Sequence, residues 1–282
     1  MEDLQGIYDM HVHTAPDLIP RKYTDFQLVD AAVRAGAAGI VIKAHHGSTA
    51  ARACLCNWYA RKVYGAVPFT MYGGIVLNND VGGFNPKAVK TAAGLGAKEV
   101  WLPTIDAKND REKQGRPGGL TVCGEDGNLR PEVVRVLEIV RDHRMVLSTG
   151  HISPEEIFKV CEAARNMGIT RIVITHPEFW IVGLSLAEQK KLIDQYGAIM
   201  ERCYKQPLPD HTWKDNCEDN IKAVKTLGWK HTAIATDSGQ TVNEPWEEAL
   251  LHVVRTFADA GISHEAIQYM TRTVQKKLLG LS

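Results

Sequence analysis

The chain comprises 282 residues, of which 44% are apolar and 23% are charged, a composition ordinary for a globular protein. Its 33 Lys and Arg residues balance its 33 Asp and Glu residues, so no overall field is available to attract a polyanion. With no basic segment and no apolar run of about 18 residues, neither nucleic acid nor a membrane is expected as a partner.

The N-terminal residues and the cysteines indicate a cytoplasmic protein. Residues 1–6 carry neither the cationic flank nor the apolar run of a secretory signal. The six cysteines are scattered through a chain long enough to bury its own core, and we expect reduced thiols. Cys54 and Cys56 have no second pair at suitable spacing, which disfavours a structural zinc site there.

Short runs rich in apolar and β-branched residues recur along the chain and predict eight strands. They cover residues 7–13, 39–45, 69–77, 99–105, 145–151, 171–176, 198–204 and 232–237. The intervening stretches have helical periodicity, with capping patterns at Ser153 and Ser185 and glycines such as Gly36 and Gly197 at their ends. Because the strands are apolar throughout, we expect a parallel sheet buried on both faces.

Eight such units without a linker predict an α/β fold, a single-domain (β/α)8 TIM barrel over residues 1–282. An open doubly wound sheet is the alternative. Gly261 separates the eighth helix from a C-terminal helical tail at residues 264–282. The longest connection, residues 106–130, follows the fourth strand on the side where barrel enzymes carry their chemistry, and either a substrate-covering lid or a disordered segment is expected.

Histidines gather at the ends of the predicted strands. These ends make up about a tenth of the chain, so random placement would put roughly one histidine there. Six of the eleven histidines fall there, namely His11, His13, His45, His46, His151 and His176. Asp237 ends the eighth strand in the same way. Packing alone does not explain such clustering.

The expected geometry brings these side chains together. His11 and His13 are two residues apart on one strand and therefore face the same side. The first and eighth strands are neighbours in a closed barrel, which places Asp237 beside that pair, and His151 and His176 arrive from the fifth and sixth strands. Imidazoles with one carboxylate suit a divalent metal, zinc first and manganese, iron or nickel as alternatives. One or two ions are expected; buried histidines bonded to backbone are the alternative.

This pattern resembles that of the amidohydrolase superfamily over essentially the whole chain. The resemblance is carried by Asp9-Met10-His11-Val12-His13, Thr149-Gly150-His151, Thr175-His176-Pro177 and Ala235-Thr236-Asp237-Ser238. It implies that His11, His13 and Asp237 bind one metal ion, and that His151 and His176 bind a second ion or the substrate. It implies a hydrolase and leaves the substrate open.

One departure concerns the lysine that dinuclear members often carry, in carboxylated form, on the fourth strand. Residues 99–105 contain none. Lys43 instead lies near the end of the second strand, two residues before His45 and on the same face. Lys43 is a candidate metal ligand as a carbamate, with a substrate anion contact or a structural ion pair as alternatives. His45 is expected to contact metal or substrate, and His46 faces the other way.

Further residues on the same rim are candidates for contact with a substrate. The predicted substrate-binding residues are Arg21, His45, Asn78, Trp101 and Glu201. Arg21 lies in the loop after the first strand, where an anionic group could reach it. Glu201 and Arg202 are adjacent, so only one of them can face the barrel interior. Cys203 is not a predicted nucleophile, because no base can be assigned to it.

The sequence therefore predicts hydrolysis by a metal-activated water, with Asp237 as the base and His176 or His45 stabilising the developing oxyanion. The resemblance favours an amide, cyclic amide or lactone of a small molecule as the target. The alternatives are a metal-dependent phosphoesterase, a mononuclear decarboxylase in which Arg21 binds a carboxylate, and a metal-containing binding protein without activity. A homo-oligomer is left open.

Overall fold

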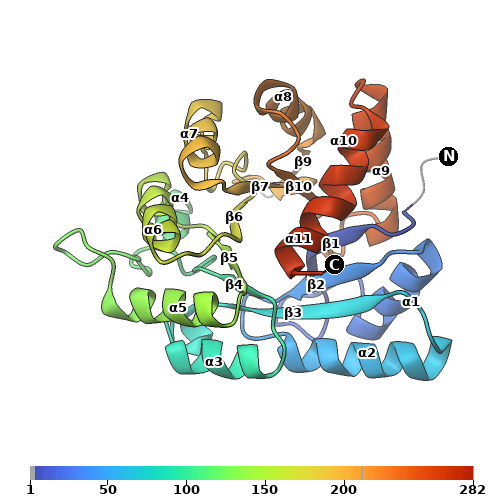
Figure 1. Cartoon of the computed structure of the whole chain (residues 1–282), viewed down its shortest axis with the longest axis horizontal. Coiled ribbons are helices and arrows are strands. Elements are labelled where there is room, and N and C mark those ends of the chain that lie inside the picture. Colours follow the sequence, from blue (N-terminus) through green and yellow to red (C-terminus); the bar gives the residue numbers. More distant parts are fainter. Residues whose placement is uncertain (1–3, 211, 282) are drawn as a thin grey trace.

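The computed structural model describes residues 4–210 and 212–281 and shows a parallel barrel wrapped by helices (Figure 1). Its strands pair in the order β1-β2-β3-β4-β5-β6-β7-β10. They are β1 Tyr8–His13, β2 Gly39–Lys43, β3 Thr70–Val76, β4 Glu99–Trp101, β5 Val146–Ser148, β6 Ile172–Thr175, β7 Ile199–Cys203 and β10 Thr232–Ala235.

The first and last strands of this sheet meet and close the cylinder. The backbone N–H of His13 donates to the carbonyl of Ser238 at 2.8 Å, and the N–H of Asp237 donates to the carbonyl of His11 at 2.9 Å. A parallel bridge joins Val12 to Ser238. The predicted single-domain TIM barrel is therefore confirmed, and the open sheet is excluded.

One helix follows each strand and covers the outside of the barrel. These helices are α1 Asp25–Ala35, α2 Ala50–Tyr64, α3 Pro86–Gly94, α5 Pro131–Asp142, α6 Pro154–Asn166, α7 Leu186–Tyr196, α8 Cys217–Leu227 and α9 Trp246–Asp259. The capping boxes at Ser153 and Ser185 satisfy backbone N–H groups that the first helical turn leaves free. Gly36 and Gly197 adopt left-handed conformations and end their helices.

The C-terminal segment packs under the barrel. It consists of α10 His264–Gln268, a π-helical turn η2 Tyr269–Thr273 and α11 Val274–Leu279. Val274 and Leu278 join one buried cluster with Tyr8, the first residue of β1, and α11 lies beside β1 in Figure 1. This segment therefore closes the end of the barrel at which the strands begin and leaves the other end for a site.

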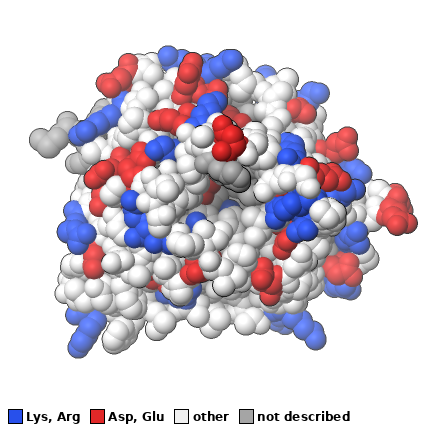
Figure 2. All heavy atoms as spheres, turned by 180° about the vertical axis from the view of Figure 1, so that it is seen from behind, with Lys and Arg blue, Asp and Glu red and all other residues white. Residues whose placement is uncertain are grey.

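Short helices and strands lie in the loops at the end of the barrel where the strands finish. They are a 3-10 turn η1 Asn79–Val81, a helix α4 Lys108–Lys113, and an antiparallel hairpin of β8 Lys205–Pro207 and β9 Trp213–Asp215. Acidic and basic side chains are interspersed over the face of the molecule in Figure 2. Within the described ranges, no helix has both the length and the hydrophobicity needed to cross a bilayer.

Several strands are shorter than their apolar runs predict. The sequence predicts a strand to residue 105, but β4 ends at Trp101 and is followed by Leu102 and Pro103. A proline has no N–H to donate to the next strand, so the chain leaves the sheet here. His45, His151, His176 and Asp237 likewise lie one to three residues beyond their strands, in the loops that follow.

Candidate active site

Two residues of the site have unusual backbone conformations just past the strand ends. His176 has φ of 28° and Asp237 has φ of 54°, in the left-handed region that side chains rarely adopt. Such strain persists only where the surroundings enforce it, and it concentrates at functional sites. Two residues after Asp237, a Cβ on Gly239 would lie 2.1 Å from the carbonyl oxygen of His13. Only glycine therefore allows the backbone at residue 239 to approach the end of β1 this closely.

His11, His13 and Asp237 converge at the mouth of the barrel, as the sequence predicts. Oδ1 of Asp237 lies 3.2 Å from Nε2 of His11 and 3.2 Å from Nε2 of His13. Donor atoms of the three residues lie within 4.8 Å of one another. Burial raises the pKa of Asp237, but the two histidines outweigh it and hold the pKa well below its usual range. Asp237 is therefore an anion between two imidazoles.

A second carboxylate, that of Glu201, contacts the ring nitrogen of His11 that does not face Asp237. Nδ1 of His11 lies 2.9 Å from Oε2 of Glu201, and both side chains are buried. Burial lowers the pKa of His11, but Asp237 and Glu201 together raise it to about 9. Nδ1 donates to Glu201 and Nε2 points to Asp237, where a metal cation can replace the proton.

Lys43 reaches the same place from β2. Its Nζ lies 3.0 Å from Nε2 of His11, and its side chain is 1% exposed. Burial lowers the pKa of Lys43. No carboxylate of the described residues forms an ion pair with it, which speaks against the purely structural ion pair among its three predicted roles.

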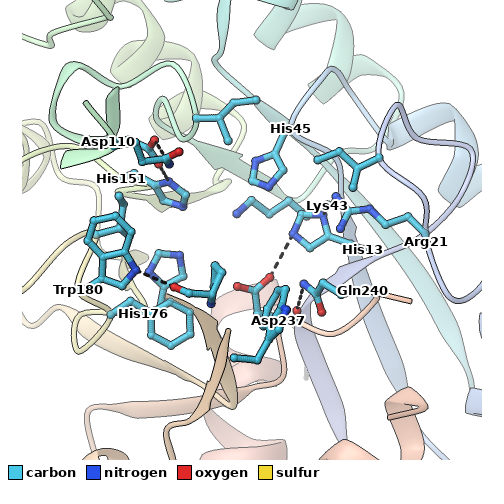
Figure 3. Close-up of a pocket in the computed structure, with 17 residues that line it drawn as sticks. His13, Arg21, Lys43, His45, Asp110, His151, His176, Trp180, Asp237 and Gln240 are labelled. Atoms are coloured by element: carbon cyan, nitrogen blue, oxygen red, sulfur yellow. Dashed lines mark hydrogen bonds and ion pairs between the residues drawn. The ribbon is translucent and has the colours of Figure 1, made fainter. Parts of the chain in front are cut away.

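His45 and His151 face each other across the cavity, but their outer nitrogens are held differently (Figure 3). Nδ1 of His151 lies 2.6 Å from Oδ2 of Asp110, so Nδ1 donates and Nε2 keeps its lone pair for a cation. Nδ1 of His45 lies 2.8 Å from Oγ1 of Thr104. Thr104 in turn accepts from Nδ2 of Asn78 at 2.8 Å.

That chain of bonds holds the ring of His45. The hydroxyl of Thr104 accepts from Asn78 and can either donate to Nδ1 of His45 or accept from it with its second lone pair, so the direction of this bond depends on the tautomer of His45. The amide of Asn78 has a fixed orientation, because its Oδ1 accepts from the backbone N–H of Thr104 at 2.8 Å. Burial holds the pKa of His45 well below its usual range. Neutral His45 presents an N–H to the cavity when its Nδ1 accepts from Thr104, and a lone pair, as a metal ligand would, when its Nδ1 donates to Thr104.

His176 completes the ring of imidazoles. Its ring stacks on Phe179 with centroids 4.4 Å apart and lies 4.9 Å from the ring of His151. Burial holds the pKa of His176 well below its usual range. Nδ1 of His176 is buried and has no hydrogen-bond partner among the described residues. A buried imidazole nitrogen without a partner is costly, and a bound ligand would relieve that cost.

The loop predicted as a lid or a disordered segment forms a wall of the site. Residues 106–130 are all described, and α4 carries Asp110 to His151. Nδ2 of Asn109 donates to the carbonyls of His151 and Ile181 at 2.9 and 2.8 Å. The segment is thus bonded to the loops that follow β5 and β6.

These side chains surround a cavity of about 300 Å³, at the lower end for small-molecule sites. Its lining combines polar side chains, from the strand ends and from the loops, with apolar side chains from the loops. The lining residues are His13, Ile19, Arg21, Lys43, His45, Ile105, Asp110, Gln114, His151, His176, Phe179, Trp180, Ile181, Pro207, Trp213, Asp237 and Gln240.

Three of the predicted substrate-binding residues lie behind this lining. Glu201 holds His11, Asn78 holds Thr104, and the ring of Trp101 lies 6.2 Å from the ring of His11. The geometry gives Glu201 and Asn78 positioning roles. Arg202 points away from the barrel interior, to Glu178 and Gln189.

Sequence reasoning missed Asp110 and the aromatic wall. Asp110 sits in a polar stretch whose charges resemble those of any exposed loop, and no spacing links it to His151. Trp180, Pro207 and Trp213 come from the loop after β6 and from the hairpin, which carried no strand prediction. The one hint of this wall in the sequence is the presence of large tryptophan side chains in otherwise polar loops.

The donor set fits a divalent cation. His11, His13 and Asp237 offer two nitrogens and a carboxylate oxygen, which suit zinc and its neighbours in the periodic table. His151 and the unpartnered His176 offer further nitrogens. A separate cluster consists of exposed Asp215 and His252 and buried Cys217. There Asp215 accepts from the backbone N–H of Cys217, the first residue of α8.

Comparison with curated proteins returns no match. Among solved structures, a protein from Pseudomonas putida with a provisional assignment as a 2-pyrone-4,6-dicarboxylic acid hydrolase is 18% identical, with a TM-score of 0.60. The match covers 99% of this chain and 98% of that one.

Two further solved structures are similar. A dipeptidase described as a metallopeptidase is 12% identical over 99% of both chains, with a TM-score of 0.66. An enamidase described as a member of the amidohydrolase superfamily is 14% identical, with a TM-score of 0.59 over 99% of this chain and 68% of that one. The resemblance to that superfamily is thus confirmed at the level of the fold.

A family model matches the chain over residues 6–201, which is most of the barrel. That model describes a family of unknown function, DUF6282, and the chain belongs to it.

Proposed function

We propose that this protein is a metal-dependent hydrolase that cleaves an amide, cyclic amide or lactone bond of a small molecule. The observation that carries the proposal is the convergence of His11, His13 and Asp237 at the mouth of the barrel, where His13 and Asp237 line a cavity. The shared fold with metal-dependent and other hydrolases supports it.

In this proposal, His11, His13 and Asp237 hold one divalent ion, with zinc the best fit to the donors. His151, His176 and Lys43 hold a second ion or meet the substrate. An ion bound there would lower the pKa of a bound water to about 7 and polarise the bond under attack.

The protein groups supply proton transfer and charge stabilisation. Asp237 accepts a proton from the attacking water and passes it to the leaving group. His45 donates a cavity-facing N–H to the oxygen on which negative charge develops, in the tautomer in which its Nδ1 accepts from the hydroxyl of Thr104. His176 is a second donor for the same oxygen if it does not bind a metal.

The test is metal analysis of the purified protein with a turnover screen of amides, lactones, phosphoesters and carboxylic acids. We expect bound divalent metal, hydrolysis of amides or lactones, and no turnover after chelation. An Asp237→Asn variant is expected to lose turnover while keeping its unfolding temperature within a few degrees. Full activity of that variant would overturn the role of Asp237.

The same screen discriminates the alternatives. Release of CO2 with one metal and an unmodified Lys43 would favour decarboxylation, and phosphate release would favour a phosphoesterase. Retention of one small molecule without turnover of any substrate would favour a binding protein. We also propose a cytoplasmic location, supported by the six free cysteines.

A further inference from the structure

The cavity contains one guanidinium that the proposed chemistry does not use. Arg21 lines the cavity, and its side chain is 3% exposed. Its Nε donates to Asp17 at 2.8 Å and its Nη2 donates to Nδ1 of His13 at 3.2 Å. Among the described residues, Nη1 has no hydrogen-bond partner. A nearly buried guanidinium with an unused N–H favours an anionic acceptor in the cavity.

Two contacts hold the backbone beside Arg21 in place. The N–H of Lys22 donates to the carbonyl of Gly239 at 2.8 Å, and an antiparallel bridge joins Arg21 to Gln240. The loop after β1 is therefore fastened to the loop that carries Asp237. An anion bound by Arg21 would be held at a set distance from the proposed reaction centre.

The His13 ring connects Arg21 to that centre. Its Nδ1 faces Arg21, and its Nε2 faces Asp237 at 3.2 Å. Arg21 and Asp237 therefore contact the same imidazole, and both line the cavity. An anion on the unpaired Nη1 of Arg21 would lie in the cavity that contains the proposed reaction centre.

Aromatic side chains also line the cavity. Phe179, Trp180 and Trp213 are among the lining residues, and Trp180 lies on the other side of the cavity from Arg21 (Figure 3). Nε1 of Trp180 donates to the carbonyl of Pro207 at 2.7 Å, so the indole offers a ligand only its ring. Phe179 stacks on His176 with an interplanar angle of 9°. Rigid aromatic walls of this kind favour a flat apolar group.

We propose that the substrate is a small amide or lactone that also bears a free carboxylate and an aromatic ring, with the carboxylate on Arg21 and the ring against Phe179, Trp180 and Trp213. The inference rests on the proposed function for the bond that is cleaved, but the binding mode does not depend on turnover. A single carboxylate suits the site better than a phosphate dianion, because Asp17 already neutralises part of the charge on Arg21.

The experiment is calorimetric binding of three compounds that cannot be hydrolysed to the protein as purified with its metal. These are 3-phenylpropanoate, 3-phenylpropan-1-ol and propanoate. We expect 3-phenylpropanoate to bind about 10- to 100-fold more tightly than either of the others, since one lacks the charge and the other the ring. Equal affinity for the acid and the alcohol would overturn the proposal.

Variants test the contact with the carboxylate and the contact with the ring separately. Arg21→Gln should abolish the preference for the acid over the alcohol, and Arg21→Lys should restore only part of it. Lys22→Gln is the matched control, because Lys22 does not line the cavity and the charge change is the same. If Arg21→Gln retains the preference, the carboxylate binds elsewhere and the proposal is wrong. Should Arg21→Gln not fold, the Arg21→Lys comparison decides alone, and an unchanged preference again overturns the proposal.

For the ring, Trp213→Ala should reduce the preference for 3-phenylpropanoate over propanoate. Trp58→Ala is its control, because Trp58 is 59% exposed on α2. An unchanged preference in Trp213→Ala would contradict the proposed contact between the ring of the ligand and Trp213.

A turnover assay then separates this inference from the proposed hydrolase. N-acetyl-L-phenylalanine and N-acetyl-L-phenylalaninamide differ in the free carboxylate. Hydrolysis of the neutral compound alone would overturn the substrate class and leave the hydrolase intact. Binding that depends on Arg21 without hydrolysis of any compound would overturn the hydrolase and support the anionic aromatic ligand.

Discussion

Oδ2 of Asp110 lies 2.6 Å from Nδ1 of His151, although Asp110 belongs to a polar loop that follows a different strand. Asp110 is buried, and its other oxygen accepts from Gln114 and Arg116 at 2.6 and 2.8 Å. The carboxylate thus joins one wall of the cavity to the imidazole and fixes the nitrogen that faces the cavity.

We expect Asp110→Asn to reduce metal affinity or kcat/KM by about 10- to 100-fold, as is usual for a carboxylate behind a metal-binding histidine. Metal content after dialysis and steady-state kinetics measure the effect. Glu112→Gln is the control, since Glu112 lies on the same helix with its side chain 60% exposed. Equal losses in both variants would show that the loop as a whole matters, and not the bond to His151.

Glu201 is expected to act through His11. Glu201→Gln removes the charge that helps to raise the pKa of His11, so the protein should lose its metal to a chelator at about 10- to 100-fold lower concentration. The exposed Glu218→Gln on α8 serves as the comparison. A raised KM with unchanged metal retention would instead support the substrate contact that the sequence predicts.

Gly239 is expected to be intolerant of any side chain. Gly239 has φ of 132°, and a Cβ there would overlap the carbonyl oxygen of His13. Gly239→Ala should therefore lower the unfolding temperature sharply and disrupt metal binding. Gly94→Ala adds the same methyl group to α3, where nothing lies within 4 Å, and should be neutral or stabilise by up to about 1 kcal/mol. Thermal unfolding of both variants provides the measurement.

Glu244 should give the stability a measurable dependence on acid pH. Partial burial raises its pKa, but hydrogen bonds from Lys205 and Tyr204 outweigh this and lower it to about 2. The folded state therefore binds the proton less readily than the unfolded chain does. The contribution of Glu244 is complete above the unfolded pKa, about 4.5, and is lost as the pH falls toward 2.

Glu244→Gln should accordingly cost about 1 kcal/mol at neutral pH and progressively less below pH about 4.5. Denaturant unfolding at pH 7 and at pH 3.5 tests this. A cost that is the same at both pH values would show that the ion pair with Lys205 contributes nothing.

The barrel and the convergence of His11, His13 and Asp237 could be predicted because their signals are local. Buried parallel strands leave continuous apolar runs, and the alternation of side chains along a strand puts His11 and His13 on one face. Asp237 follows from the closure of the barrel. These inferences need only periodicity and strand order.

The rest depends on contacts that no short-range pattern encodes. The partners of the imidazoles come from elsewhere in the chain: Asp110 from a loop, Thr104 from beyond β4, and Glu201 from β7. The exact strand ends are set by Pro103 and by left-handed turns such as that at Gly150, where a Cβ would lie 2.3 Å from the carbonyl oxygen of Leu102. The orientations of these imidazole rings depend on such contacts.

The backbone hydrogen bonds between β1 and the residues after β10 bear on the order in which the protein folds. The amide protons of His13 and Asp237 lie in the seam that joins the earliest and latest strands to be synthesised. Such long-range pairing forms late, because it requires closure of the largest loop in the chain. A nascent chain therefore carries its histidines before the proposed metal site is assembled, and in the finished protein these two amides should exchange with deuterated solvent only when the whole barrel opens.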